Sequence, residues 1–190
     1  MKTQRTSMVS FLGMALFLTV SFLTAPQISA AATAAEINRD VDSALKNLYR
    51  ITPVAQKLAK ISKGVLVFPK IVKAGLVVGG QYGEGALRVG GKTTGYYKTV
   101  AASYGLQAGA QTFGYALFFL DNASLQYLNQ SKGWEIGVGP SIVIVDEGVA
   151  RSLTTTTAQS GVYAFIFQQK GLMAGLGLQG SKISKISPTK

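Results

Sequence analysis

The chain contains neither cysteine nor histidine among its 190 residues. Their absence excludes thiol nucleophiles, disulfide bonds, zinc sites built from Cys or His, and Ser-His-Asp catalytic triads. It also removes imidazole, the side chain that titrates closest to neutral pH. We therefore expect no enzyme, no catalytic residues, no cofactor and no metal. A carboxylate-based hydrolase or metal site is kept as an alternative, because acids distant in sequence can converge in a fold. It ranks third, below the two functions described at the end of this section. Its candidates are Glu84, Asp121, Glu135, Asp146 and Glu147.

Acidic residues are also scarce, because 8 Asp and Glu stand against 19 Lys and Arg, which gives a net charge of +11. Such an excess indicates a polyanionic partner, which means nucleic acid, an anionic lipid surface or a phosphorylated ligand. The plainer alternative is that the charge serves solubility alone. The 22 glycines are well above an average share and point to bends and close backbone approaches.

The amino terminus has the pattern of a secretory signal peptide. Lys2 and Arg5 precede an uncharged, mostly apolar run over residues 8–24, and small residues are frequent over 25–35. We predict a signal peptide over 1–32, with cleavage after Ala32 or Ala34, and a periplasmic or extracellular location. An uncleaved membrane anchor is the alternative. Without Lys2 and Arg5, 17 basic residues stand against 8 acidic ones, a net charge of +9. No second run of about 20 apolar residues follows, so we expect no spanning helix in the mature chain.

Two amphipathic helices are expected first. Apolar residues recur at helical spacing over residues 35–49, and again from Pro53 to about Lys63. Thr52 is expected to cap the second helix, and Gly64 to end it. A short helix over 122–130 is expected later, capped by Asp121.

From Gly64 onward the apolar pattern alternates with a period of two, as in strands. We expect a strand that Pro69 ends, a hairpin turn at Gly90-Gly91 and a turn over 146–148. The expected strands are 65–68, 76–82, 85–89, 95–103, 104–120, 134–145, 153–158, 162–168, 172–178 and 182–187. Helices first and strands afterwards predict one α+β domain over 35–187. Its N-terminal amphipathic helices would pack on a strongly curved, mainly antiparallel, glycine-rich β-sheet or partial barrel.

Five segments together carry a family resemblance. They are KGVLVFPKIVKAG (63–75), GGQYGEGALRVGGKTTGYY (79–97), AASYGLQAGAQ (101–111), GWEIGVGPSIVIVD (133–146) and FIFQQKGLMAGLGLQGSKISKI (165–186). Their order and spacing resemble the SYLF domain family, which includes lipid-binding domains related to yeast actin-patch proteins and many secreted bacterial members. The resemblance implies a non-enzymatic lipid-binding module, with phosphatidylinositol-type lipids bound by eukaryotic relatives. For an exported bacterial protein, the property that carries over is affinity for anionic phospholipid membranes.

The strongest charge bias in the chain supplies the candidate lipid-binding residues. Seven cations fall within 28 positions that contain no acid: Lys46, Arg50, Lys57, Lys60, Lys63, Lys70 and Lys73. A lysine or arginine near an anionic bilayer contributes roughly 1 kcal/mol to binding. We therefore predict that a basic helical surface docks on anionic phospholipid. The alternative is a solvated face on helices that serve only the core.

Two further patterns are given structural interpretations. The glycines over 79–85 lack the spacing of a phosphate-binding loop, and alternation places Gly79, Gln81, Gly83 and Gly85 on one side of a strand. The aromatic residues do not interleave with the lysines, so no nucleic-acid partner is expected.

The runner-up function is a small outer-membrane β-barrel or structural envelope protein, because alternating strands after a signal peptide also fit that class. Such a barrel would need detergent for extraction.

Overall fold

A computed structural model describes residues 31–75, 78–104, 109–130, 133–145, 147–159, 161–171 and 180–189. Two helices come first, α1 (Ala34–Ile51) and α2 (Pro53–Ile61), and four long strands follow. These are β1 (Gly64–Gly75), β2 (Val78–Val89), β3 (Lys92–Tyr104) and β4 (Gly109–Phe119). The remaining elements are α3 (Asn122–Gln130), β5 (Trp134–Glu135), β6 (Ile142–Val145), α4 (Glu147–Ser152), β7 (Val162–Gly171) and β8 (Lys182–Ile186).

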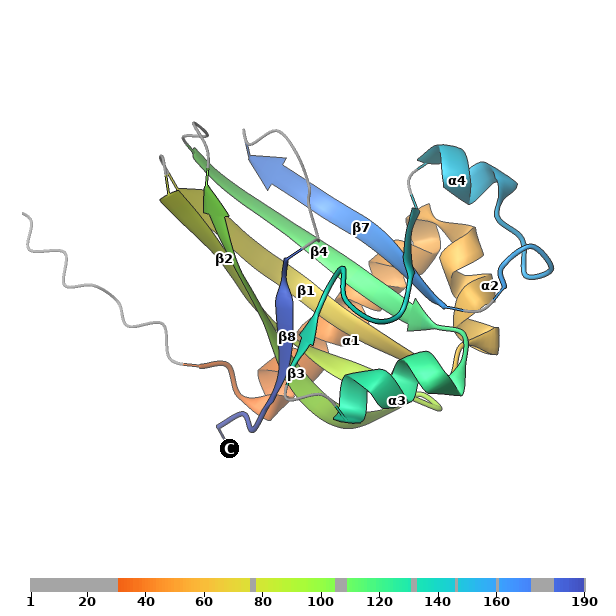
Figure 1. The fold of residues 1–190 in the computed structure, drawn as a ribbon, viewed down its shortest axis with the longest axis horizontal. Helices are drawn as coiled ribbons and strands as arrows, with labels where there is room; N and C mark the ends of the chain where they lie inside the picture. Colours follow the sequence, from red (N-terminus) through yellow and green to blue (C-terminus); the bar gives the residue numbers. More distant parts are fainter. Residues whose placement is uncertain are drawn as a thin grey trace, which may run out of the picture. The chain divides into compact units, whose positions relative to one another are not determined.

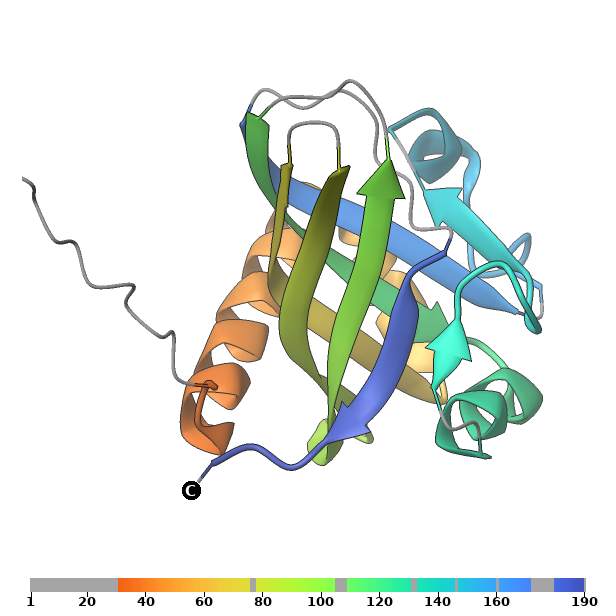
Figure 2. The same ribbon diagram turned by 60° about the vertical axis from the view of Figure 1, so that its left-hand side comes forward.

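The eight strands form one sheet in the order β5-β8-β3-β2-β1-β4-β7-β6. Every neighbouring pair is antiparallel except β6 and β7, which are parallel. The sheet curls into a half-barrel (Figures 1 and 2). The curl brings β4 and β3 together across its hollow side, where the hydroxyl of Tyr115 donates to Thr99 Oγ1 at 3.0 Å although β1 and β2 lie between these strands. The predicted α+β class with a strongly curved, mainly antiparallel sheet is therefore confirmed.

The enclosed side of the sheet holds an aromatic-rich core. Phe68 and Tyr115 pack with ring centroids 4.9 Å apart, and Phe119 packs against Trp134 at 5.9 Å. Leu128 of α3 joins this cluster. Burial raises the pKa of Tyr115, whose hydroxyl is wholly enclosed. This core fixes the curl, and thereby the shape of the outer side on which the helices sit.

A second core lies between the outer side of the sheet and the two N-terminal helices (Figure 2). The apolar stripe of α1 is buried, as its helical spacing predicts. It packs with α2 against alternate sheet residues such as Val67, Phe118 and Phe165. Arg88 of β2 ties α1 to the sheet through Asp42 and the carbonyl oxygen of Asn38. The helices thus serve the core, and only their opposite faces are open to a partner.

Pro69 does not end the first strand, contrary to the prediction. β1 continues to Gly75 through an irregularity, where its register against β2 shifts between Val67 and Lys70. Proline lacks a backbone donor and is tolerated at such a bulge. The predicted break between residues 82 and 85 is also absent, because β2 is continuous. The Gly90-Gly91 turn is confirmed, with φ angles of 56° and 78°.

Four other local predictions were wrong. α2 ends at Ile61, and Gly64 is already in β1. The expected strand over 134–145 is interrupted by Gly137 and Gly139, whose φ angles of 109° and 93° are incompatible with a strand. Residues 154–157 form a turn whose threonines hydrogen-bond to one another. A helix, α4, begins at Glu147 in place of the expected turn. The strand predicted over 172–178 lies outside the described residues.

Candidate functional site

Five of the seven predicted lipid-binding cations lie on or beside the two helices and are exposed. Lys46 and Arg50 belong to α1, Lys57 and Lys60 to α2, and Lys63 to the connection with β1. Within the described part of the chain, none of them forms a salt bridge. Their charges are therefore not neutralised by the fold and are available to an external anion.

The two strand lysines do not extend this helical surface as one band. Lys70 and Lys73 are three positions apart on β1, so they point to opposite sides of the sheet. Lys70 is exposed and pairs with Glu84 in register, on the side that carries the helices. Lys73 is half-buried on the enclosed side, between the buried residues Gln81 and Gln111. Of the seven cations grouped by the sequence, five therefore lie on or beside the helices and two lie on the sheet.

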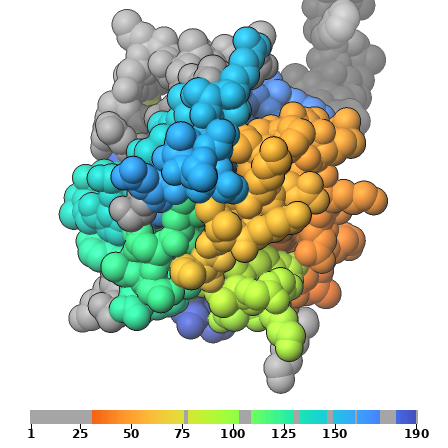
Figure 3. All heavy atoms as spheres, turned by 90° about the vertical axis from the view of Figure 1, so that its right-hand side faces the viewer, coloured from red at the N-terminus to blue at the C-terminus, as the bar shows by residue number. Residues whose placement is uncertain are grey.

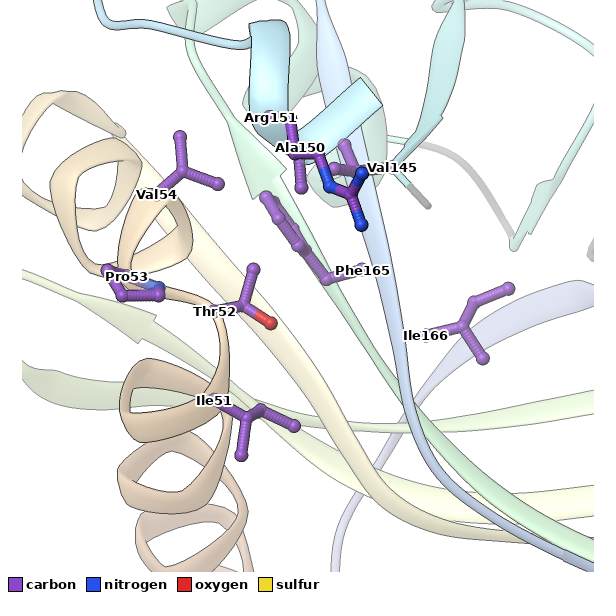
Figure 4. Close-up of a pocket in the computed structure, with 9 residues that line it drawn as sticks. All are labelled: Ile51, Thr52, Pro53, Val54, Val145, Ala150, Arg151, Phe165 and Ile166. Atoms are coloured by element: carbon purple, nitrogen blue, oxygen red, sulfur yellow. The ribbon is translucent and has the colours of Figure 1, made fainter. Parts of the chain in front are cut away.

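A pocket of about 570 Å³ lies at the corner where α1 meets α2. We call it the helix-corner pocket, and Figure 4 shows its lining side chains. Its walls come from the helix corner, β6, α4 and β7: Ile51, Thr52, Pro53, Val54, Val145, Ala150, Arg151, Phe165 and Ile166. Seven of these nine residues are apolar. In Figure 3, α2 (yellow-orange) lies beside α4 and the segment that follows α4 (both blue).

Two of the predicted lipid-binding residues are close in sequence to residues that line the pocket. Arg50 immediately precedes Ile51, and Lys57 follows Val54 by three positions, which places it on the same side of α2 one turn later. Ile51 is 51% exposed, so its side chain is accessible to a ligand at the rim of the pocket. An apolar hollow that Arg151 lines and Arg50 adjoins fits an amphiphile that has an anionic head and a hydrocarbon tail.

A smaller pocket, of about 460 Å³, lies between the helices and the β2–β3 hairpin. Lys60 lines it together with Asp42 and Arg88. Asp42 binds the Arg88 guanidinium and offsets its charge, so Lys60 leaves this lining with one net positive charge, as Arg151 does in the helix-corner pocket. Arg88 also donates to Thr93 Oγ1, so its role is to hold α1 on the sheet. The smaller pocket is a weaker candidate for a lipid, because, of the described residues that line it, only Leu45, Ala59 and Val65 have aliphatic side chains.

Sequence reasoning missed the contribution of Arg151 and of β7 to the helix-corner pocket. Arg151 falls between the turn predicted over 146–148 and the strand predicted over 153–158, and nothing in the local sequence indicates that α4 folds beside residues 51–54. Most aromatic residues in the described part of the chain are buried in the two cores.

Other classes of site find little support in the described residues. No group of three or more acidic, His or Cys side chains is placed to hold a metal ion there. In the same part of the chain, no helix has both the length and the apolar character needed to cross a membrane. Comparison with known protein families and with curated proteins found no match. Membership of the SYLF family therefore remains a prediction from the sequence pattern.

Proposed function

We propose that this protein is an exported, non-enzymatic module that binds anionic phospholipid through the helix-corner pocket and the basic residues around it. The observation that carries the proposal is the apolar pocket beside exposed, unpaired cations on α1 and α2. The signal-peptide pattern, the positive net charge and the SYLF resemblance support the same function. The curled sheet acts as the scaffold on which α1 and α2 meet.

The free energy of the proposed binding has an electrostatic and an apolar contribution. Cations near an anionic surface each contribute about 1 kcal/mol, and this part weakens as salt screens the charges. Partial insertion of Ile51 and its neighbours would add a salt-insensitive part, since burying apolar surface contributes about 25 cal/mol per Å². Together they predict reversible, peripheral association.

Vesicle co-sedimentation tests this function. The mature protein is mixed with vesicles of phosphatidylcholine alone or of phosphatidylcholine with phosphatidylglycerol, at low and at high salt. We expect sedimentation with the anionic vesicles and little with the neutral ones, and less binding at high salt. Equal binding to both vesicle types, or binding to neither, would contradict the proposal.

A further inference from the structure

The described fold begins with a set of contacts centred on Thr33, the N-cap of α1. Thr33 and Glu36 form a capping box, in which Thr33 Oγ1 accepts from the Glu36 N–H at 3.2 Å and the Glu36 carboxylate accepts from the Thr33 N–H at 2.8 Å. Thr33 also pairs with Thr189 in a parallel bridge. The carbonyl oxygen of Thr189 accepts from the N–H of Ala34 at 3.3 Å.

These contacts bear directly on where the leader is removed. Cleavage after Ala34 would delete Thr33, and with it the capping box and the bridge to Thr189. Loss of an N-cap residue alone typically costs about 1 kcal/mol. The fold therefore favours a cleavage site that lies before Thr33.

Glu84 of β2 binds the backbone just before this cap. Its Oε2 accepts from the N–H of Ala32 at 3.1 Å, and its Oε1 accepts from the Tyr82 hydroxyl. Lys70 and Lys98 lie opposite Glu84 on the neighbouring strands. Burial raises the pKa of Tyr82 to about 12, and the hydrogen bond to Glu84 adds to the rise. The phenol thus remains a donor to Glu84 over the physiological pH range.

We propose that a leader peptidase hydrolyses the Ala31–Ala32 bond, and that the new amino terminus of Ala32 forms an ion pair with Glu84. Water is consumed in this step, which leaves a carboxylate on Ala31 and an ammonium group on Ala32. Ser29 and Ala31 then occupy positions −3 and −1, where signal peptides require small residues. The atom that bears the new charge is the nitrogen that Glu84 already contacts.

The ion pair gives Glu84 a specific role. A peptide N–H is neutral, whereas a free amino terminus is largely protonated at neutral pH. Hydrogen bonds between charged groups are roughly twice as strong as neutral ones. Processing at this bond would remove one exposed hydrogen bond, from the Thr189 hydroxyl to the Ala31 carbonyl oxygen. It would strengthen the contact with Glu84 and leave the capping box of Thr33 complete.

The cleavage site is tested by exporting the full chain from a bacterial host and measuring the intact mass and N-terminal sequence of the purified product. We expect a chain that runs from Ala32 to Lys190. Any other amino terminus, including Thr33 or Ala35, would overturn the proposed site.

The ion pair is tested separately on chains that begin at Ala32. The wild-type chain and Glu84→Gln are each prepared with a free and with an enzymatically acetylated amino terminus. We expect acetylation to lower the Tm of the wild type by about 1–4 °C and to change that of E84Q by clearly less. Glu84→Gln also removes any interaction of Glu84 with Lys70 and Lys98. That loss is common to the free and the acetylated chain, so it cancels when the two acetylation effects are compared. Equal shifts in both proteins, or no shift in either, would overturn the ion pair.

Discussion

Single glycines determine how closely β2 can approach the bulge in β1. A Cβ atom built on Gly85 would lie 2.0 Å from the carbonyl oxygen of Val67, and one on Gly83 would lie 2.6 Å from Ile71 Cγ1. Both glycines are buried on the enclosed side of the sheet, as the alternation of this stretch predicts. The glycine-rich segment therefore serves packing: it gives the backbone around Pro69 the room that a side chain would occupy.

Gly85→Ala should destabilise the fold strongly, because its methyl group would overlap backbone atoms that cannot move independently. We expect a loss of about 3 kcal/mol or more in the free energy of unfolding, measured by urea denaturation. Gly80→Ala, in the same strand, is the matched control. Its Cβ would lie an ordinary 3.5 Å from its nearest neighbour, the carbonyl oxygen of Ala101. We expect a change within about 0.5 kcal/mol there. Equal losses in the two variants would disprove this account of Gly85.

Ile51 is the residue that tests the apolar part of lipid binding. Because it is half-exposed at the pocket, Ile51→Ser should leave the stability nearly unchanged while weakening binding to anionic vesicles. Loss of one inserted aliphatic side chain corresponds to about 1–2 kcal/mol, or a five- to thirtyfold weaker apparent affinity. Val138→Ser is the control, since Val138 is 57% exposed and does not line the pocket. Equal affinities for the I51S and V138S variants would exclude insertion at the helix corner.

At the scale of elements, the sequence predicts the three longer helices, the Gly90-Gly91 hairpin and most strands, because these depend on local periodicity. Prediction from the sequence fails where tertiary contacts decide the local backbone conformation. Pro69 lies inside a strand because the bulge tolerates it, and the threonines of 154–157 satisfy their hydroxyl groups in a turn. The helix-corner pocket could not be predicted at all, because residues 51–54 meet α4 and β7 only through long-range packing.

Asp121 joins two elements, since its carboxylate caps α3 and also binds the start of β7. It accepts from the N–H groups of Ser124 at 2.7 Å and Gly161 at 2.6 Å. Partial burial pushes the pKa of Asp121 upward, but these hydrogen bonds outweigh it and the pKa lies below its ordinary value. A carboxyl group with a lowered pKa stabilises the fold at neutral pH, and this stabilisation is lost as the pH falls through the folded-state pKa.

Asp121→Asn should therefore lower the free energy of unfolding by about 1–2 kcal/mol at pH 7, because an amide cannot accept both N–H groups in the same way. The difference from the wild type should shrink as the pH is lowered from about 5 towards 2. Asp40→Asn is the control, because Asp40 and its partner Arg39 are both well exposed. Denaturation curves across this pH range provide the measurement. A D121N deficit that stays constant down to the acid limit would rule out the ionised cap.

In the molecule as a whole, one curled sheet separates two hydrophobic cores that have different structural roles. The enclosed core fixes the curl, and the outer core fastens α1 and α2 while leaving their basic faces free. Helices whose apolar stripes are largely buried can therefore still carry exposed lysine and arginine side chains on their opposite faces. The exposed Lys182 and Lys185 lie on β8, which β3 and β2 separate from β1 in the sheet.

Binding of anionic phospholipid by the exposed cations of the helices is tested by comparing two charge-reversal variants. Affinity for phosphatidylglycerol-containing vesicles is measured for the wild type, for K57E/K60E and for K182E/K185E, which make the same change in net charge. We expect at least about tenfold weaker binding for K57E/K60E and a clearly smaller change for K182E/K185E. Equal weakening in both variants would disprove a specific role of the helical cations, as would unchanged binding of K57E/K60E.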